Sequence, residues 1–311
     1  MGDVLAGIHA TWEFDSDSVL IRFERGIRTP KLLSALGERR IPHEALAEVT
    51  LTPGKRGTVV LHAVPRSGAD PLMDAAAGQL KEGCDPYRLV LPAEREVLAE
   101  YYADELRGRV RAAGTALGLS EGEPADRFLV APPGGPSQFK AYDAKAGFDG
   151  TQVTFRWFWT GASSAKWKVG DQSFPVAALS GVEWRSPDLS GGHLRLLRRD
   201  GAADGGAGGT GGAGGAAAGP ADQDPAAVVF GLGYGPVHES LPFAASVLAA
   251  VRSTVPAAAA LDRVAVDAVG AGRRDPADIA ERIRHLGELH QAGLVTDEEF
   301  TAKKAELLAQ L

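Results

Sequence analysis

Apolar and polar residues alternate in two stretches near the start of the chain. Residues 8–14 and 19–25 place apolar side chains at every second position, which is the period of a β-strand with one buried face. The polar run between them, 15–18, favours a turn. Shorter strands are predicted at 38–41, 49–52, 58–64 and 87–91.

After the last of these strands the apolar period becomes helical. Antiparallel strands followed by one helix define an α+β domain, in which the helix covers an opening or an edge of a curved sheet. The apolar stripe that predicts this amphipathic helix consists of Val97, Leu98, Tyr101, Tyr102, Leu106 and Val110.

The same succession of elements occurs a second time. Residues 14–23 align with 148–157 at a constant offset of 134 positions, and the next blocks keep nearly the same offset. The second copy also ends in a helical pattern, with Ser240 as a candidate cap. Each copy spans about 110 residues, the size of a domain rather than of a solenoid repeat. The matched positions are Phe14 with Phe148, Asp15 with Asp149, Val19 with Val153, Ile21 with Phe155, Arg22 with Arg156, and Phe23 with Trp157.

One block in each copy carries a family resemblance. Residues 41–49 read Ile-Pro-His-Glu-Ala-Leu-Ala-Glu-Val, and residues 174–182 read Phe-Pro-Val-Ala-Ala-Leu-Ser-Gly-Val. These blocks resemble the strand and turn of bacterial pleckstrin-homology-like domains, and both copies resemble the domain of unknown function 4429. The resemblance implies two tandem antiparallel β-barrels, each closed by a C-terminal helix, at 1–114 and 139–254. An excess of 24 Arg over 9 Lys agrees with a GC-rich bacterial source.

Segments of biased composition separate these domains. Residues 115–138 are rich in Gly, Pro and acidic residues and are predicted to be a linker. Residues 201–223 are predicted to form a disordered Gly-rich loop, in place of the 66–83 loop of the first copy. Within it, 206–211 matches the spacing of a dinucleotide-binding loop, but it lacks the flanking strand, helix and acidic partner, so composition alone explains the match. The Ala-rich residues 255–274 are predicted to be a flexible linker.

The last part of the chain, 275–311, has the pattern of a two-helix hairpin. A first apolar stripe ends at Gly293, a residue type that terminates helices. Thr296 and Glu299 then form a capping box for a second helix. The segment resembles SHOCT, a short C-terminal domain found in many unrelated bacterial proteins. This resemblance implies a module for oligomerisation or partner contact, without chemistry of its own.

A hairpin of 37 residues is too small to bury its apolar stripes by itself. We therefore expect a second copy of the chain or a partner helix to complete them. The residues expected to bind this partner are Ile283, Leu286, Leu289, Leu294, Phe300, Leu307 and Leu308.

Basic residues gather between positions 22 and 40, where six cations face two carboxylates. The family resemblance implies that such an early loop often contacts anionic lipid headgroups. Four net charges are worth about 4 kcal/mol at an anionic membrane, which corresponds to about millimolar affinity. A solvated loop that keeps a strand edge soluble is the alternative. The candidate residues for an anionic ligand are Arg25, Arg28, Lys31, Arg39 and Arg40.

A segment in the second copy combines basic and aromatic residues. Residues 156–159 read Arg-Trp-Phe-Trp, and Lys-Trp-Lys follows shortly after, a composition seen in grooves for single-stranded nucleic acid. Strand alternation instead places Phe155, Trp157 and Trp159 on one face, so we expect these three in the core and no nucleic-acid partner. Phe158 points the other way, which predicts an interface between the two copies.

The sequence presents no catalytic or metal-binding motif. His285 and His290 are five positions apart on one predicted helix, so they face different directions. Residues 15–18 begin like a calcium loop, but Val19 and Leu20 stand where oxygen ligands and glycine are needed. We expect no cofactor, no metal and no enzymatic activity.

Charge and cysteine content narrow the functional class. A net charge of −7 argues against a general nucleic-acid or membrane binder. A single cysteine, Cys84, and the lack of a secretory pattern in residues 1–14 predict a cytoplasmic protein. We therefore expect a non-enzymatic adaptor or scaffold that binds and oligomerises through its hairpin and domain surfaces. The alternative is a peripheral membrane sensor acting through the loop from Arg25 to Arg40; an enzyme would need a polar pocket with perturbed acids in both copies.

Overall fold

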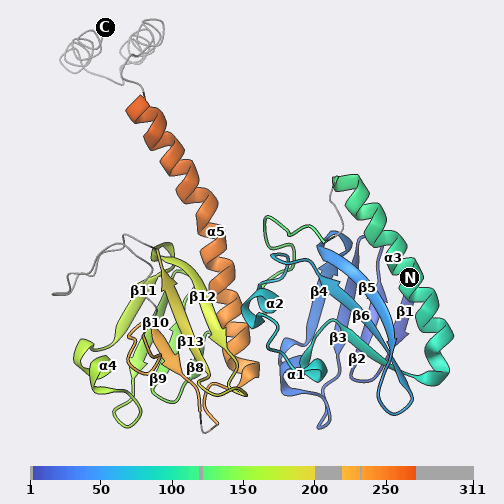
Figure 1. Ribbon diagram of the computed structural model, residues 1–311, viewed down its shortest axis with the longest axis horizontal. Coiled ribbons are helices and arrows are strands. Elements are labelled where there is room, and N and C mark those ends of the chain that lie inside the picture. The colour runs from blue at the N-terminus through green and yellow to red at the C-terminus, as the bar shows by residue number, and fades with distance from the viewer. Residues whose placement is uncertain (1–2, 119–121, 200–218, 232, 271–311) are drawn as a thin grey trace, which may run out of the picture. The chain divides into compact units, whose positions relative to one another are not determined.

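The computed structural model describes residues 3–118, 122–199, 219–231 and 233–270 (Figure 1). Both copies lie in one compact unit that ends at Thr254. The predicted hairpin, with all seven of its partner-binding residues, lies outside the described residues.

The first copy consists of two antiparallel sheets and a C-terminal helix. Its four-stranded sheet pairs in chain order β1 (Asp3–Ala6), β2 (Ala10–Phe14), β3 (Ser18–Phe23) and β4 (Glu38–Pro42), with α1 (Lys31–Leu36) before β4. Its three-stranded sheet pairs β5 (Leu46–Pro53), β6 (Thr58–Pro65) and β7 (Arg88–Pro92), with α2 (Pro71–Ala76) before β7. Helix α3 (Glu96–Leu117) ends the copy.

The second copy repeats this plan, which confirms the α+β class and the duplication. Its four-stranded sheet consists of β8 (Gln138–Lys140), β9 (Ala144–Phe148), β10 (Gln152–Trp157) and β11 (Gln172–Pro175), with α4 (Ser164–Val169) before β11. Its three-stranded sheet consists of β12 (Leu179–Arg185), β13 (His193–Arg198) and β14 (Ala227–Val229). The C-terminal helix is α5 (Val237–Gly270).

The predicted closed barrels do not form. Between the two sheets of the first copy, the described residues make one isolated bridge, in which Ile8 N donates to Val90 O (2.7 Å). The chain turns from β1 into β2 at residues 7–9, so β1 is too short to extend this pairing. At the other edge a 3-10 turn at His43–Ala45 carries the chain from β4 into β5. Each copy is therefore a pair of packed sheets with a helix across them.

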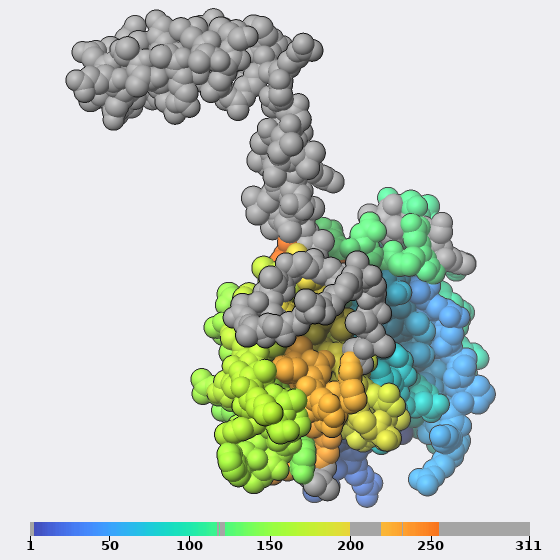
Figure 2. Space-filling view, turned by 60° about the vertical axis from the view of Figure 1, so that its left-hand side comes forward, coloured from blue at the N-terminus to red at the C-terminus, as the bar shows by residue number. Residues whose placement is uncertain are grey.

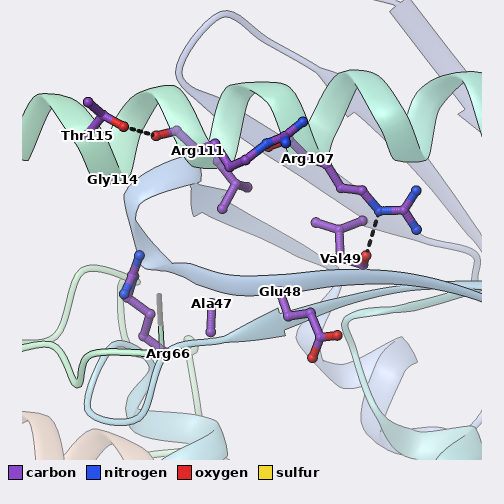
Figure 3. Close-up of a pocket in the computed structure, with 10 residues that line it drawn as sticks. Ala47, Glu48, Val49, Arg66, Arg107, Arg111, Gly114 and Thr115 are labelled. Carbon is purple, nitrogen blue, oxygen red and sulfur yellow. Dashed lines mark hydrogen bonds between the residues drawn. The ribbon is translucent and has the colours of Figure 1, made fainter. Parts of the chain in front are cut away.

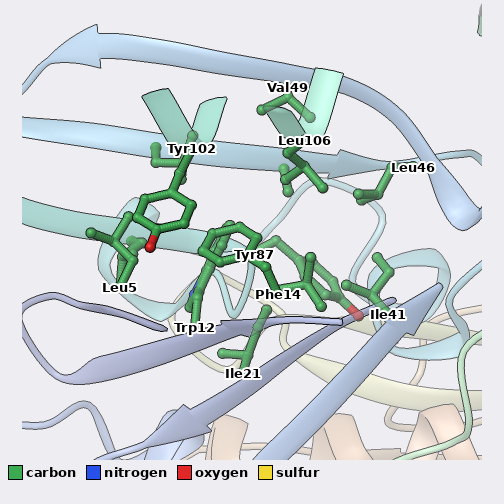
Figure 4. Packing of buried hydrophobic residues seen from close by; sticks show 14 of the residues in the cluster. Leu5, Trp12, Phe14, Ile21, Ile41, Leu46, Val49, Tyr87, Tyr102 and Leu106 are labelled. Carbon is green, nitrogen blue, oxygen red and sulfur yellow. The ribbon is translucent and has the colours of Figure 1, made fainter. Parts of the chain in front are cut away.

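The core of the first copy lies between its sheets and under α3 (Figure 4). Trp12, Ile21 and Tyr87 are fully buried there. Phe14 stacks on Tyr102 of α3, with ring centroids 4.7 Å apart. Complete burial of each large apolar side chain contributes about 2 kcal/mol, so these residues fix the helix on the sheets.

The first turns of α3 bury a different face from the predicted one. The apolar stripe predicts burial of Val97, Leu98 and Tyr101, but all three are exposed. Ala99 and Ala103 are buried in their place. Small side chains allow the helix to approach the sheet closely, which turns the larger ones outward. The later part of the stripe is buried as predicted.

The two segments predicted as linkers, 115–138 and 255–274, are partly helical, and part of the first packs against the first copy. Helix α3 continues to Leu117, and the chain after it lies on the first copy, with Val130 buried in that core. Helix α5 continues to Gly270, so residues 255–270 are helical rather than a flexible linker, because alanine is the strongest helix former. Within the predicted loop 201–223, residues 219–223 are described and include a turn.

The two copies pack against each other (Figure 2), and α2 of the first copy contacts β12 of the second (Figure 1). Leu72 and Ala76 of this helix are buried and belong to the core of the second copy. Next to them, Gln79 Nε2 donates to Trp184 O (3.0 Å), and Ser186 N donates to Gln79 Oε1 (2.9 Å). The side-chain amide therefore joins the first copy to β12.

The predicted role of Phe158 in this interface is wrong. Phe158 lines a pocket formed by residues of the second copy alone. The interface is formed by the 66–83 loop, where the two copies differ most. Strand alternation describes strands only, so it could not predict a contact made by this loop.

Candidate functional site

Arg39 is a structural residue rather than a ligand-binding one. Its side chain is 3 % exposed, and Nη2 lies 2.6 Å from Asp70 Oδ1. Tyr87 Oη donates to Asp70 Oδ2 (2.5 Å), and Arg39 Nη1 donates to Ala131 O (3.1 Å). Burial, followed by the charge of Asp70, raises the pKa of Tyr87 well above its usual value. Arg39 therefore connects β4, α2 and the segment between the copies, and its assignment to an anionic site is wrong.

Arg40 is exposed but already paired. Its Nη1 lies 2.5 Å from Asp15 Oδ2 and also donates to Ser18 Oγ (2.8 Å). Asp15 stands at the first hairpin turn, so this pair fixes β4 beside that turn. An anion at Arg40 would have to compete with a neighbouring carboxylate.

The other three candidates lie close together on the chain, from the residues after β3 to the first residue of α1. Arg25, Arg28 and Lys31 are exposed, and none makes an ion pair with any residue that the structure describes. Ile27 between them is completely exposed. Thr29 is buried below, where its hydroxyl lies 3.3 Å from His9 Nδ1. We call residues 25–31 the basic loop; with Glu24 its local charge is +2, half the charge of the whole run.

A groove of about 740 Å³ lies between β5 and α3 (Figure 3). Its apolar floor contains Val49, and Arg66, Arg107 and Arg111 surround it. Arg107 Nε donates to Val49 O (2.9 Å), and Arg66 Nε donates to Glu44 O (3.0 Å). Arg107 thus holds α3 against β5, and Arg66 holds the β6–α2 loop against the 3-10 turn at His43–Ala45, so the groove is a packing feature of the first copy.

The histidine and cysteine side chains form no reactive cluster among the described residues. His43 is buried, and burial, followed by the charge of Arg109, lowers its pKa. His62 Nε2 lies 3.1 Å from Asp85 Oδ2 at the surface. Burial raises the pKa of the Cys84 thiol, which disfavours the reactive thiolate. The described part of the chain also contains no group of three or more His, Cys, Asp or Glu suited to a metal ion.

The aromatic segment of the second copy divides at the end of β10. Phe155 and Trp157 are buried, as alternation predicts. Trp159 is 77 % exposed, so its predicted place in the core is wrong. The strand ends at Trp157 and the chain turns at Phe158, so the period of two no longer applies. Trp159 and Trp167 instead lie at the surface with their ring centroids 5.0 Å apart.

These features define a duplicated α+β protein whose distinguishing surfaces lie on the loops between the third and fourth strands of each copy. No helix in the described part of the chain is long and apolar enough to cross a bilayer. The chain belongs to the family described as Domain of unknown function (DUF4429), which matches residues 12–107 and 146–248. The Short C-terminal domain, SHOCT, matches residues 281–308. No curated protein matches the chain. Both predicted resemblances are thereby confirmed.

Proposed function

We propose that the chain is a cytoplasmic, non-enzymatic adaptor. In this proposal the two copies form one platform, and the C-terminal domain recruits a second copy of the chain or a partner helix. The observation that carries it is the interface through α2: Leu72 is fully buried in the core of the neighbouring copy. Deleting such a side chain costs about 2–5 kcal/mol, enough to hold the copies in one arrangement.

A pleckstrin-homology-like fold for each copy belongs to the same proposal. It is supported by the four-stranded sheet, the three-stranded sheet and the C-terminal helix that both copies share. A fold of this kind does not define an activity, so the proposal rests on the interface and on the tail rather than on the fold.

The recruitment step is tested with the full chain and a chain ending at Gly270. We expect light scattering to give a larger mass per particle for the full chain, and affinity capture to recover partners only with it. Leu286→Asp in the full chain should act like the truncation, whereas Gln291→Asp in the same segment should not. Equal mass and equal capture for all four proteins would overturn the proposal.

A second candidate function is favoured by Ile27 at the centre of the basic loop. Two net charges near an anionic membrane are worth about 2 kcal/mol, and burial of one isoleucine adds about 2 kcal/mol. The sum corresponds to about millimolar affinity. Membrane binding through this loop would therefore depend on oligomerisation, which can raise apparent affinity by about 10²- to 10⁴-fold.

Flotation with anionic vesicles tests this candidate. The triple variant Arg25→Glu, Arg28→Glu and Lys31→Glu should lose flotation, and Ile27→Asn should reduce it. The matched control changes the exposed cations Lys55, Arg127 and Arg185 to Glu. Absence of flotation with every protein, or equal flotation of the triple variant and its control, would rule the membrane function out.

A further inference from the structure

The second copy carries a pocket of about 640 Å³ lined by aromatic side chains. It opens beside the end of β10, helix α4 and the turn before α5. Lys140 and Thr160 are the other residues that line it. The aromatic lining consists of Tyr142, Trp157, Phe158, Trp159, Trp167 and Tyr234.

A buried ion pair fixes the wall of this pocket. Lys166 Nζ lies 2.6 Å from Asp143 Oδ2, and both side chains are almost completely buried. Asp143 O accepts from Phe158 N (2.8 Å), which holds the turn after β10. Gly161 allows that turn to lie against the backbone of Tyr142, because a Cβ there would overlap the carbonyl oxygen. The pocket is therefore formed before any ligand arrives, which lowers the entropy lost on binding.

Four of the rings pack against each other in two pairs, but their N–H and O–H groups have no hydrogen-bond acceptor among the described residues. Trp159 and Trp167 meet edge to face, and so do Tyr142 and Tyr234, with centroids 6.3 Å apart. No described residue accepts a hydrogen bond from either indole N–H or from either hydroxyl of these four. By contrast, the buried Trp157 Nε1 donates to Gly170 O (2.7 Å). The pocket thus presents free donors beside exposed ring faces.

We propose that this pocket binds a proline-rich segment of a partner protein in the polyproline II conformation. Such a segment has no internal hydrogen bonds, and its proline residues lack the N–H donor. It therefore presents carbonyl acceptors and apolar rings, which complement indole and phenol donors set among aromatic faces. Aromatic-lined grooves recognise this conformation, which also loses little entropy because it is already extended. This proposal deepens the adaptor function by naming its partner class, and it rests on that function.

Other ligand classes fit the lining less well. A sugar would find hydroxyl groups but no carboxylate or side-chain amide in the lining, and the nearby Asp143 is buried and bound to Lys166 and to Val229 N. A cation would face Lys140, and the Lys166 ammonium, 5.0 Å from the Trp157 ring centroid, already takes the cation–π position at that ring. A nucleic acid would find one lysine in the lining of a chain whose net charge is −7.

The proline-rich segment of the chain itself is already engaged. In residues 131–136, Ala131 O accepts from Arg39 and Pro133 O accepts from Ser246 Oγ (3.2 Å). Pro133 is also buried. We therefore expect the proline-rich peptide to come from a partner protein.

Fluorescence anisotropy with the full chain tests the proposal. The probes are labelled oligoproline and Pro-x-x-Pro peptides, a peptide with alanine in place of proline, and single-stranded oligothymidine; flotation with anionic vesicles is run in parallel. We expect the proline peptides to bind, and Trp159→Ala to weaken them at least tenfold, as for a central aromatic contact. Tyr234→Phe, which removes a donor and keeps the ring, should weaken them less. Tyr101→Ala, at an exposed tyrosine of α3, is the matched control.

Several outcomes would overturn the proposal. These are failure of all proline peptides to bind, equal binding of the alanine peptide, or no effect of Trp159→Ala while near-ultraviolet circular dichroism shows a folded chain. Binding of oligothymidine or vesicles that depends on Trp159, without peptide binding, would replace it with that ligand. Because none of these measurements depends on residues 275–311, their failure is distinct from failure of the recruitment test.

Discussion

Replacement of Lys166 by Met tests whether a buried ion pair holds the second copy together. Lys166 Nζ and Asp143 Oδ2 are 2.6 Å apart, and the side chains are 0 % and 1 % exposed. Asp143 Oδ1 also accepts from Val229 N (3.0 Å). The carboxylate therefore ties α4 and β14 to the start of β9. The variant leaves this carboxylate buried without its cation.

The expected loss of unfolding free energy is about 3–5 kcal/mol, the range for removing one partner of a buried pair. Burial already raises the pKa of Asp143 and lowers that of Lys166. Without the ammonium, the pKa of Asp143 should rise further. A carboxyl whose folded pKa exceeds its unfolded value, about 4, contributes stability below that value and loses it as pH rises through the folded pKa. The penalty should therefore be smallest in acid and complete once the pH exceeds the raised pKa.

Urea unfolding at about pH 7 and about pH 4 measures this difference. The double variant Lys166→Met with Asp143→Asn keeps an acceptor for Val229 N but removes the buried charge. It should recover about 2 kcal/mol or more relative to the single variant. A single-variant loss below about 1 kcal/mol, an equal loss at both pH values, or no recovery in the double variant would refute this reasoning.

Three further predictions concern other parts of the compact unit. Leu72→Asp places a charge in the core shared by the copies, so calorimetry should show two unfolding transitions; one unchanged transition would contradict the interface. Tyr87→Phe removes the donor to Asp70 and should cost about 1–3 kcal/mol in urea unfolding, and wild-type stability would show that the network is dispensable. The pKa of Asp149 is lowered to about 2 because the backbone N–H of Thr151 and its neighbour donate to the carboxylate. Stability from this turn is therefore present above the unfolded pKa of about 4 and is lost as pH falls toward 2; a carboxyl titration by NMR with a midpoint near 4 would contradict it.

Local periodicity was sufficient to predict the shared framework of both copies. Alternation identifies β2, β3, β5 and β6. The match is cleanest in β2, where every second residue is buried, whereas β3 and β6 also bury consecutive residues, at 18–21 and 59–61. It misses β1, whose four residues are too few to establish a period. It also misses α2, although Asp70 before Pro71 is a recognisable helix start, and Asp70 does cap that helix through Leu72 N (2.9 Å).

The basic residues between positions 22 and 40 show why charge counting could not define the site. Arg39 and Arg40 are adjacent in sequence, but the strand places one inside and the other at the surface. Arg39 meets Asp70 and Tyr87, which are 31 and 48 positions away. Such long-range partners are fixed by tertiary packing and leave no mark in the local sequence. The free donors of the aromatic pocket are hidden from sequence for the same reason.

The same backbone hydrogen bond holds the loop after the third strand in both copies, although the two loops present different side chains. After the third strand, Glu24 N donates to His9 O (2.9 Å) in the first copy. At the same place in the second copy, Phe158 N donates to Asp143 O, and both loops then lead into a six-residue helix.

The side chains on these loops have diverged. The contact between His9 and Thr29 lies beneath the basic loop, whereas in the second copy Asp143, paired with Lys166, holds the turn that leads to Trp159. A duplicated pair with one ligand would require the same side chains at both loops. The backbone hydrogen bonds that support the two loops correspond, but the exposed residues on the loops do not. We therefore expect the copies to bind different ligands. Trp159→Ala should leave vesicle flotation through the basic loop unchanged.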